Sequence, residues 1–372
     1  MKKICIVVPP SPGLFDQRTN VPLGPLYIAA ALQRAGVEVQ VISLLNHPVP
    51  ASWPRADLYA IGFTTPQAGA VSGLIALIRA QYYDAIVLAA GPHPTAMPHQ
   101  TLLLGFDSVL TGEGERTILD IVHDLPNLSP VYVGRPVKDL DSIPLPARHL
   151  LPREDLYNDA TAVFRGKHVD GHVTSIMGSR GCPNSCSFCS NPLFATRTRF
   201  RSAENIVTEL KAMVAQDVDC FKFQDDTFAI RPEAVIALGQ ACGDAFEPGE
   251  IATRMNTRVD SFPAEVLPAL HQAEVEVVAF GIESGSQTVL DSVRKHITIE
   301  QAESALRLAH DDGFLTLGLF VFGLPGECEE TVDETIEFWR RNRPFMDQAN
   351  LAVFVPYPGC DVAKRPAHYR MH

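Results

Sequence analysis

The chain has 372 residues, enough for two domains, and its hydrophobic share of 46% and charged share of 20% are typical of a packed globular protein. Its formal net charge of −12 argues against a nucleic-acid partner, because phosphate binding favours a basic surface. No apolar run reaches the length of about 18 residues that a membrane-spanning helix needs. The apolar stretch near Met1 is soon ended by prolines, which argues against a signal peptide, so a cytoplasmic protein is expected.

The first part of the chain alternates short apolar runs with helical patterns. One helix is expected over Leu26–Ala35, because Gly36 follows it in the usual terminating position. Apolar strands separated by helices predict a parallel sheet covered on both faces, that is, a Rossmann-like domain over residues 1–130. The expected strands are Ile4–Val8, Glu38–Leu44, Leu58–Phe63, Ala85–Ala90 and Ser108–Leu110.

Four loops rich in glycine and proline follow these strands. The carboxyl ends of parallel strands share one edge of the sheet, and this edge is where such sheets bind ligands. A single loop of this kind is explained by ordinary turn chemistry. Together they favour a binding edge, formed by residues 9–13, 62–66, 91–95 and 111–115.

A linker is expected over residues 131–171, because this stretch is irregular and dotted with prolines. Strand–helix alternation then resumes, with Ser202 as the N-cap of one helix and Gly313 at the end of another. Six such units predict a partial (β/α)6 TIM-type barrel over residues 172–360, followed by a short tail, 361–372. Its expected strands are Val173–Met177, Cys220–Gln224, Ile251–Met255, Val275–Ile282, Thr316–Phe322 and Ala349–Val355.

Three of the 8 cysteines are clustered directly after the first barrel strand: Cys182, Cys186 and Cys189. Cysteines at this spacing can surround one soft metal centre, and three thiolates leave one iron of a four-iron cluster without a protein ligand. A structural zinc site is the main alternative, but it requires a fourth ligand, and His168 and His172 lack the usual spacing. Inert thiols are the third interpretation, which suits the other, scattered cysteines.

The C-x3-C-x2-C spacing, with Phe188 before the last cysteine, resembles the signature of radical S-adenosylmethionine enzymes, and the resemblance extends over nearly the whole chain. It implies a [4Fe–4S] cluster on Cys182, Cys186 and Cys189. In that family the methionine part of S-adenosylmethionine chelates the open iron, and an electron from the cluster cleaves the cofactor to a 5′-deoxyadenosyl radical. Phe188 would lie beside the adenine.

Further stretches that end the later barrel strands resemble the same family. Asp225 and Asp226 would bind the amino group of S-adenosylmethionine, although a solvated pair capping the next helix is the simpler alternative. Arg258 would pair with the cofactor carboxylate, and a surface ion pair is the alternative there. The resemblance also implies cofactor contacts for Glu283, Ser284 and Leu324.

The front domain resembles the cobalamin-binding domain of one large subgroup of these enzymes. The D-x-H-x-x-G motif that supplies a histidine to cobalt is absent from this domain, and Asp170-Gly171-His172 departs from it because residue 175 is serine. The lower face of cobalt is therefore expected to be vacant or water-bound unless His93 turns inward, and the domain could also be an empty relic. The cobalamin-binding residues implied are Leu23, Gly24, Thr64, Thr65, Gly91, His93, Gly112, Glu113 and Gly114.

The resemblance implies a cobalamin-dependent C-methyltransferase acting on a small-molecule or natural-product substrate. One alternative is radical dehydration, decarboxylation, cyclisation or epimerisation without working cobalamin, and another is a non-catalytic metal-binding module. An external electron donor such as flavodoxin or ferredoxin is expected. Because few residues follow Cys360, the substrate pocket is expected to be either more open or closed by a protein partner.

Overall fold

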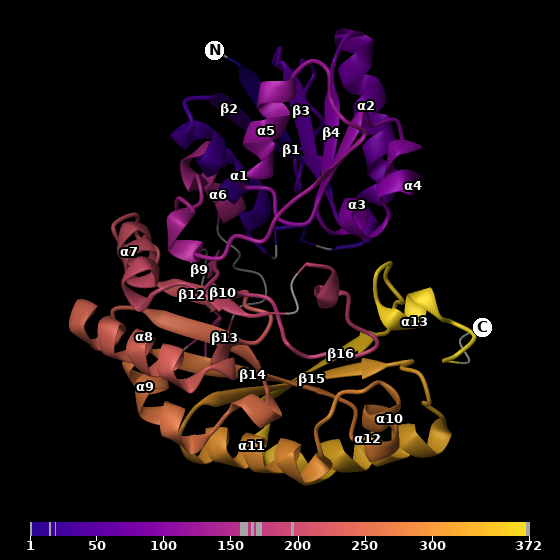
Figure 1. Ribbon diagram of the computed structural model, residues 1–372. Helices are drawn as coiled ribbons and strands as arrows, with labels where there is room; N and C mark the ends of the chain where they lie inside the picture. Colours follow the sequence, from indigo (N-terminus) through magenta and orange to yellow (C-terminus); the bar gives the residue numbers. More distant parts are fainter. Residues whose placement is uncertain are drawn as a thin grey trace. The chain divides into compact units, whose positions relative to one another are not determined.

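The structure is a computed structural model that describes residues 2–14, 16–18, 20–156, 163–164, 167–168, 173–194 and 197–369. The chain divides into two compact units, residues 1–161 and 162–372 (Figure 1). In the described part of the chain, no helix combines the length and apolar character needed to cross a membrane. The sequence stretch Asp170-Gly171-His172 lies outside the described residues.

The first unit is built on one parallel sheet with the strand order β2-β1-β3-β4-β5-β6, which confirms the Rossmann-like prediction. Residues 131–133 were expected in the linker, and this was wrong: they form β6, which pairs with β5. The chain order reverses between β1 and β3, and ligands bind at such switch points in open α/β sheets. The strands are β1 Lys3–Val8, β2 Glu38–Ser43, β3 Leu58–Gly62, β4 Val87–Ala90, β5 Ser108–Thr111 and β6 Val131–Val133.

Helices connect these strands, and the first begins at Leu23, three residues before the expected start at Leu26. The first helix ends before Gly36, whose φ of +77° terminates it as expected. Pro92–Ala96 was predicted as a loop, but it forms the short helix α3 because prolines are accommodated in a first helical turn. The helices are α1 Leu23–Arg34, α2 Ala68–Gln81, α3 Pro92–Ala96, α4 Pro98–Leu102, α5 Thr117–Asp124 and α6 Arg153–Leu156.

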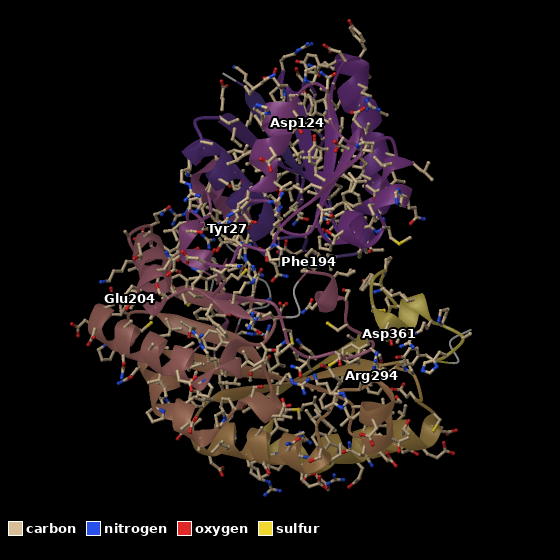
Figure 2. The ribbon with its side chains drawn as sticks, viewed as in Figure 1. Tyr27, Asp124, Phe194, Glu204, Arg294 and Asp361 are labelled. Atoms are coloured by element: carbon tan, nitrogen blue, oxygen red, sulfur yellow. The ribbon has the colours of Figure 1, made fainter. Side chains whose placement is uncertain are left out.

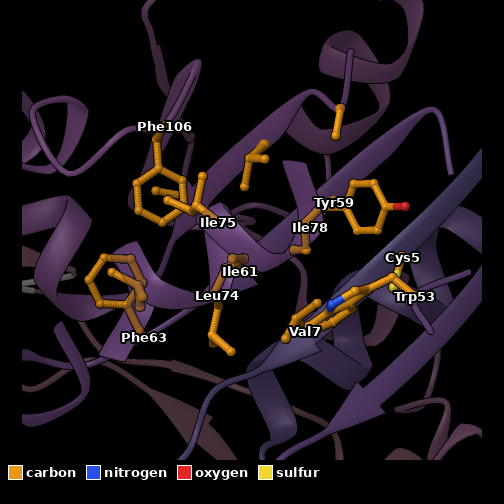
Figure 3. Close-up of a cluster of buried hydrophobic side chains, with 14 of the residues drawn as sticks. Cys5, Val7, Trp53, Tyr59, Ile61, Phe63, Leu74, Ile75, Ile78 and Phe106 are labelled. Atoms are coloured by element: carbon orange, nitrogen blue, oxygen red, sulfur yellow. The ribbon is translucent and has the colours of Figure 1, made fainter. Parts of the chain in front are cut away.

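The core of the first unit lies between β3 and α2 (Figure 3). Alternate β3 side chains project toward the apolar stripe of the helix, because strand side chains alternate between the two faces. Removing these side chains from water is the main contribution to the stability of the sheet. The buried side chains of this interface are Tyr59, Ile61 and Phe63 from the strand, and Leu74, Ile75 and Ile78 from the helix.

The second unit contains a curled parallel sheet with the order β16-β15-β14-β13-β12-β9, which confirms the predicted partial barrel. Two short antiparallel pairs accompany it: β7 Val163–Phe164 with β8 Lys167–His168, and β10 Ser179–Arg180 with β11 Arg199–Phe200. The sheet strands are β9 Val173–Ile176, β12 Cys220–Phe223, β13 Ala252–Arg258, β14 Val275–Glu283, β15 Leu315–Phe322 and β16 Gln348–Val353.

The long helices of the second unit, among them α7, α8, α11 and α12, lie along one side of this sheet (Figure 1). Ser202 accepts a hydrogen bond from the Asn205 N–H as the predicted N-cap, and Gly313 follows α11 at φ +91°. The Thr253 hydroxyl donates to the Ala273 carbonyl just after α9, so Thr253 faces the helices. The helices are α7 Ala203–Val214, α8 Pro232–Ala245, α9 Leu267–Gln272, α10 Gln287–Ser292, α11 Ile299–Asp311, α12 Glu329–Asn342 and α13 Asp361–Lys364.

Because side chains alternate along a strand, Arg254, Asn256 and Arg258 of β13 project to the opposite face from Thr253. We call this the concave face. It is the interior of the half-barrel, and the carboxyl ends of its strands are where barrel enzymes carry their reactive residues.

Candidate functional site

The segment that carries the three clustered cysteines follows β9 and β10, and we call residues 182–189 the cysteine loop. Asp226 holds both of its ends. The Gly181 N–H donates to Oδ2 of Asp226 at 2.9 Å, and the Asn191 side-chain amide donates to Oδ1 at 2.7 Å. One carboxylate therefore fixes the distance between the start of the loop and the residue just beyond it.

The middle of the cysteine loop is anchored through the backbone of Ser187, which is fully buried. The Ser187 N–H donates to the Val293 carbonyl after α10 at 2.8 Å, and the Ser187 carbonyl accepts from the Val362 N–H of α13 at 3.1 Å. An ion pair between Arg294 and Asp361 at 2.5 Å joins the same two elements, and Figure 2 shows both side chains. Hydrogen bonds from Arg365 and Tyr369 are the main cause of a lowered pKa of Asp361. The positive charges of Arg365 and Arg294 lower this pKa further.

Asp225 supports the turn that leads into the cysteine loop. Its two oxygens accept hydrogen bonds from the Gly178 N–H at 2.8 Å and the Ser179 hydroxyl at 2.5 Å. The side chain is buried, and burial raises its pKa to about 6. The alternative of a solvated pair capping the next helix is therefore wrong for Asp225, because the turn after β9 already occupies this carboxylate.

Donors and positive charges surround the three thiols. The side-chain amide of Asn184 lies 3.4 Å from the Cys182 sulfur, and the Asn191 N–H lies 3.4 Å from the Cys189 sulfur. Arg258 Nη1 lies 3.7 Å from the Cys186 sulfur.

Burial raises the pKa of Cys186, and the charges of Lys295 and Arg258 oppose this rise. Burial also raises the pKa of Cys189, to about 11. Nearby cations and N–H donors stabilise thiolate sulfur, which is the form that binds metal. The surroundings of the three cysteines therefore suit metal-bound thiolates.

The number of protein ligands that each kind of metal centre needs distinguishes a cluster from zinc. Across the described residues, no three His, Cys, Asp or Glu side chains converge closely enough to bind one metal ion. A mononuclear zinc site needs four ligands around a single ion, whereas a four-iron cluster binds each thiolate at a different iron and tolerates wider separation. The donor set therefore fits a [4Fe–4S] cluster better than a structural zinc.

Arg258 closes one side of this site. It is buried, so the alternative of a surface ion pair is wrong. Its Nε and Nη2 each lie 2.8 Å from an oxygen of Asp260, and Nη2 also donates to the Lys295 carbonyl at 2.8 Å. These bonds orient Nη1 toward the sulfur of Cys186.

Glu283 and Lys295 form a second polar group beside the cysteine loop. Lys295 Nζ lies 2.7 Å from Oε1 of Glu283, and Lys295 is buried. Glu283 adopts a φ of +69° at a register shift between β14 and β15, a conformation that costs about 1–3 kcal/mol for a residue with a side chain. A Cβ at Gly281 would approach Glu283 Oε1 to 3.0 Å, so glycine leaves room for this ion pair.

Sequence reasoning missed Lys295 and Asp260. Lys295 lies in the turn between α10 and α11, where no motif marks it, and only the fold brings it to the end of β14. Asp260 lies only two residues after Arg258 in the sequence, so their ion pair could have been predicted from this short separation.

Phe188 and Leu324 meet in one apolar cluster with Val289 and Val293. Leu324 is buried and Phe188 is partly exposed, so the pair offers a flat apolar surface of the kind that an adenine ring requires. Ser284 is placed differently. Its hydroxyl accepts from the Ser286 N–H and contacts the Thr335 hydroxyl at 3.1 Å, so it stabilises the turn after β14.

In the first unit, two loops meet at the switch point between β1 and β3. The side-chain amide of Gln67 donates to the Pro9 carbonyl at 3.0 Å and to the Ser11 hydroxyl at 2.9 Å. Thr64 precedes Gln67 and is exposed, and Gly24 is exposed with open space around its Cα. These loops therefore form a defined edge with small, accessible residues.

His93, one of the residues that the resemblance implies for cobalamin binding, is enclosed within the first unit. It is buried, its Nδ1 lies 3.1 Å from the Thr65 hydroxyl, and its ring stacks on Phe63. Burial lowers its pKa, which favours the neutral imidazole.

Three of the front-domain glycines are required by packing within the first unit. A Cβ at Gly91 would lie 2.9 Å from the Phe63 carbonyl, and one at Gly114 would lie 2.7 Å from Ile28 Cδ1. Gly112 has a φ of +69°, and a Cβ at this position would lie 3.1 Å from the Gly134 carbonyl oxygen. The side chain of Glu113 accepts from the Val137 N–H. Close approach of a ligand is therefore not needed to explain these glycines.

Family profiles match both units. The radical SAM superfamily profile matches residues 176–338, and the B12 binding domain profile matches residues 18–122. A protein named uncharacterized methyltransferase PH0819, from Pyrococcus horikoshii, is 30% identical over 96% of this chain and 81% of its own. The chain belongs to the radical S-adenosylmethionine superfamily. As a member, it uses S-adenosylmethionine and a [4Fe–4S] cluster, and it carries a cobalamin-binding domain.

Other relatives extend the comparison. An anaerobic magnesium-protoporphyrin IX monomethyl ester cyclase of Rubrivivax gelatinosus is 28% identical, and the match spans 83% of this chain but only 58% of the cyclase. The methyltransferase TsrM from Kitasatospora setae has a similar structure, with a TM-score of 0.77, 20% identity and coverage of 99% of this chain and 76% of its own. The cobalamin-dependent radical enzyme OxsB has a TM-score of 0.76, 16% identity and coverage of 98% and 55%. These two structures support the fold of both units.

The anchoring by Asp226 generates a prediction. Replacing Asp226 with Ala should release both ends of the cysteine loop, because each lost hydrogen bond to a carboxylate costs roughly 1.5–3 kcal/mol. We expect the reconstituted variant to lose iron to a chelator about tenfold faster than the wild type, measured anaerobically by absorbance. Asp226→Asn is the matched control, since its amide oxygen can still accept from Gly181, and its loss should be slower. Equal rates for the wild type and Asp226→Ala would contradict this anchoring role.

Proposed function

We propose that this radical S-adenosylmethionine enzyme is a cobalamin-dependent C-methyltransferase that acts on a small molecule. The observation that carries the proposal is the anchored loop of three thiols at the carboxyl end of a half-barrel, in a chain that also contains a B12-binding domain. Relatives named as methyltransferases, including one of Streptomyces wedmorensis at 25% identity, support the methyl-transfer outcome.

In this proposal Cys182, Cys186 and Cys189 are the protein ligands of the cluster. With S-adenosylmethionine bound, a cluster held by these residues would supply the one-electron reduction that starts radical chemistry on an unactivated carbon. The residues around the loop hold the thiols in place and exclude water. Arg258 and Lys295 offset the negative charge of the thiolates from one side.

The same site offers contacts for S-adenosylmethionine. Phe188 and Leu324 provide the apolar surface for its adenine, and Arg258 and the Glu283–Lys295 pair provide charged groups for its amino-acid end. Asp225, Asp226 and Ser284 contribute as positioning residues, because the hydrogen bonds described above already engage them.

Cobalamin would be bound at the switch-point edge of the first unit, where it supplies the methyl group. Gly24, Thr64 and Thr65 offer small or hydroxylated accessible positions, whereas Leu23, Gly91, Gly112, Glu113 and Gly114 shape the loops behind them. His93 does not ligate cobalt in this proposal, because its ring is buried and stacked on Phe63 within the first unit.

Two partners complete the proposal. The cluster needs an external one-electron donor such as flavodoxin or ferredoxin. A protein partner closing the barrel is supported by β16, where Leu351 is 70% exposed and Val353 is 79% exposed, because apolar side chains on an edge strand favour contact with another chain or segment.

A second candidate is radical cyclisation or a related reaction without working cobalamin. The relatives named as cyclases favour it, at 28% and 24% identity. Product analysis of an anaerobic assay distinguishes the two, because methyl transfer adds one carbon to the substrate and cyclisation does not.

Anaerobic reconstitution tests the cysteine ligands. We expect about four irons per wild-type chain and broad visible absorption from thiolate–iron charge transfer. Cys182→Ala, Cys186→Ala and Cys189→Ala should each abolish the chromophore, since each thiolate binds a separate iron. Cys220→Ala, a change at a buried cysteine of β12, should retain it. Stoichiometric zinc in protein purified without oxygen would instead support the structural-zinc alternative.

Cobalamin binding at the switch-point edge is tested by a bulky side chain there. Gly24→Trp should greatly reduce the cobalt retained after incubation with hydroxocobalamin and removal of the excess, because the indole would occupy the edge. Gly73→Trp is the matched control, since Gly73 is also an exposed helical glycine with open space, on α2. Equal retention by both variants would refute this placement, and no retention by the wild type would favour the second candidate.

A further inference from the structure

The half-barrel interior contains an arginine that neither the cysteine loop nor the fold accounts for. Arg254 is the third residue of β13 and lies in register with Lys222 of β12. Paired residues on neighbouring strands project to the same face, so both side chains belong to the concave face. Two cationic side chains, those of Arg254 and Lys222, therefore lie side by side on the concave face.

Arg254 is partly buried, and within the described residues its Nε is buried without a hydrogen-bond partner. Burial lowers the pKa of Arg254, and no carboxylate among the described residues opposes that effect. Burial and the charge of Arg254 lower the pKa of Lys222 to about 8. An unpaired buried cation is destabilising, so its presence points to a role that an anion completes.

The same unit shows how an arginine with a structural role is placed. Arg201 lies 2.6 Å from Glu209, and it also donates to the carbonyls of Met177 and Asn205. Both members of this ion pair are buried. Arg254 has no comparable partner among the described residues, although its Nε is also buried.

Arg254 also lies too far along β13 to serve the cofactor site. It precedes Arg258 by four residues, which corresponds to about 13 Å along a strand. Arg258 is the residue that reaches the Cys186 sulfur. A group bound at Arg254 therefore lies deeper in the half-barrel than the cysteine loop.

We propose that Arg254, with Lys222 beside it, binds an oxyanion of the substrate, either a carboxylate or a phosphoryl group. The planar guanidinium can bind such a group in a bidentate manner. Polar residues line the path toward the strand ends, where the Gln224 amide donates to the Ser175 hydroxyl at 2.6 Å on the same face. The substrate is then anionic at one end, with its reacting carbon directed toward the cysteine loop. The direction of the reacting carbon rests on the proposed function, whereas the binding of an oxyanion at Arg254 does not.

An anion titration of reconstituted protein tests the assignment. The melting temperature is measured in increasing sodium phosphate, and separately in sodium acetate, with sodium chloride holding the ionic strength constant. We expect at least one of the two anions to stabilise the wild type by binding the folded state. Stabilisation by phosphate alone identifies a phosphoryl group, and stabilisation by acetate identifies a carboxylate. Equal melting in all three salts would overturn the proposal.

Arg254→Met separates specific binding from the general salting effect of phosphate. The apparent dissociation constant should rise roughly ten- to hundredfold, as expected for loss of a charge-assisted contact. Without anion, this variant should melt at or above the wild-type temperature, because an unpaired cation is removed. Arg340→Met, on the exposed face of α12, is the matched control and should titrate like the wild type. Identical titrations of Arg254→Met and the wild type would refute the assignment.

If Arg254→Met does not fold, Arg254→Lys and Lys222→Met are titrated in its place. Both should weaken anion binding, and wild-type binding by both would refute the assignment. The measurement needs no turnover, so failure of the enzyme to form 5′-deoxyadenosine would count against the proposed function and leave this result unaffected.

Discussion

The cysteine loop depends on one constraint: two consecutive carboxylates at the end of β12 hold the chain on both sides of it. Asp225 fixes the turn before the loop, and Asp226 joins Gly181 to Asn191. Backbone hydrogen bonds of Ser187 attach the middle of the loop to the segments after α10 and at α13. Without these attachments, ordering the loop around a metal cluster would cost a large amount of backbone conformational entropy. The arrangement of Arg258, Lys295 and Phe188 around the thiols follows from this anchoring.

Much of the fold could be predicted from the sequence, because buried parallel strands are marked by apolar runs and helices by their caps. Ser202 and Gly313 mark helix ends by chemistry that acts locally. β6 was missed because its three residues, Val131–Val133, carry too short a pattern in a proline-dotted stretch. The helix at Pro92–Ala96 was not predicted because proline is typical of loops. Proline is also accommodated in the first turn of a helix, as it is here.

The site was predicted less completely, since sequence spacing indicates which residues lie near strand ends but not what each side chain contacts. The clustering of the three cysteines could be read from their spacing, whereas the contact between Phe188 and Leu324 is visible only in the folded chain. The resemblance implies a cofactor contact for Asp225, but only the fold shows that its carboxylate holds the turn after β9, through contacts 46 and 47 residues apart. The burial of His93 could not be predicted for a related reason: it depends on Phe63, a neighbour only in the folded chain.

Electron paramagnetic resonance of the reduced, reconstituted protein, recorded with and without S-adenosylmethionine, tests the central claim most directly. Three thiolate ligands leave one iron open, so binding of the cofactor to that iron must change the electronic environment of the cluster. The account predicts a [4Fe–4S] signal from the wild type that shifts when S-adenosylmethionine is added. A cluster signal that is unchanged by the cofactor would contradict it, because all four irons would then be coordinated without S-adenosylmethionine.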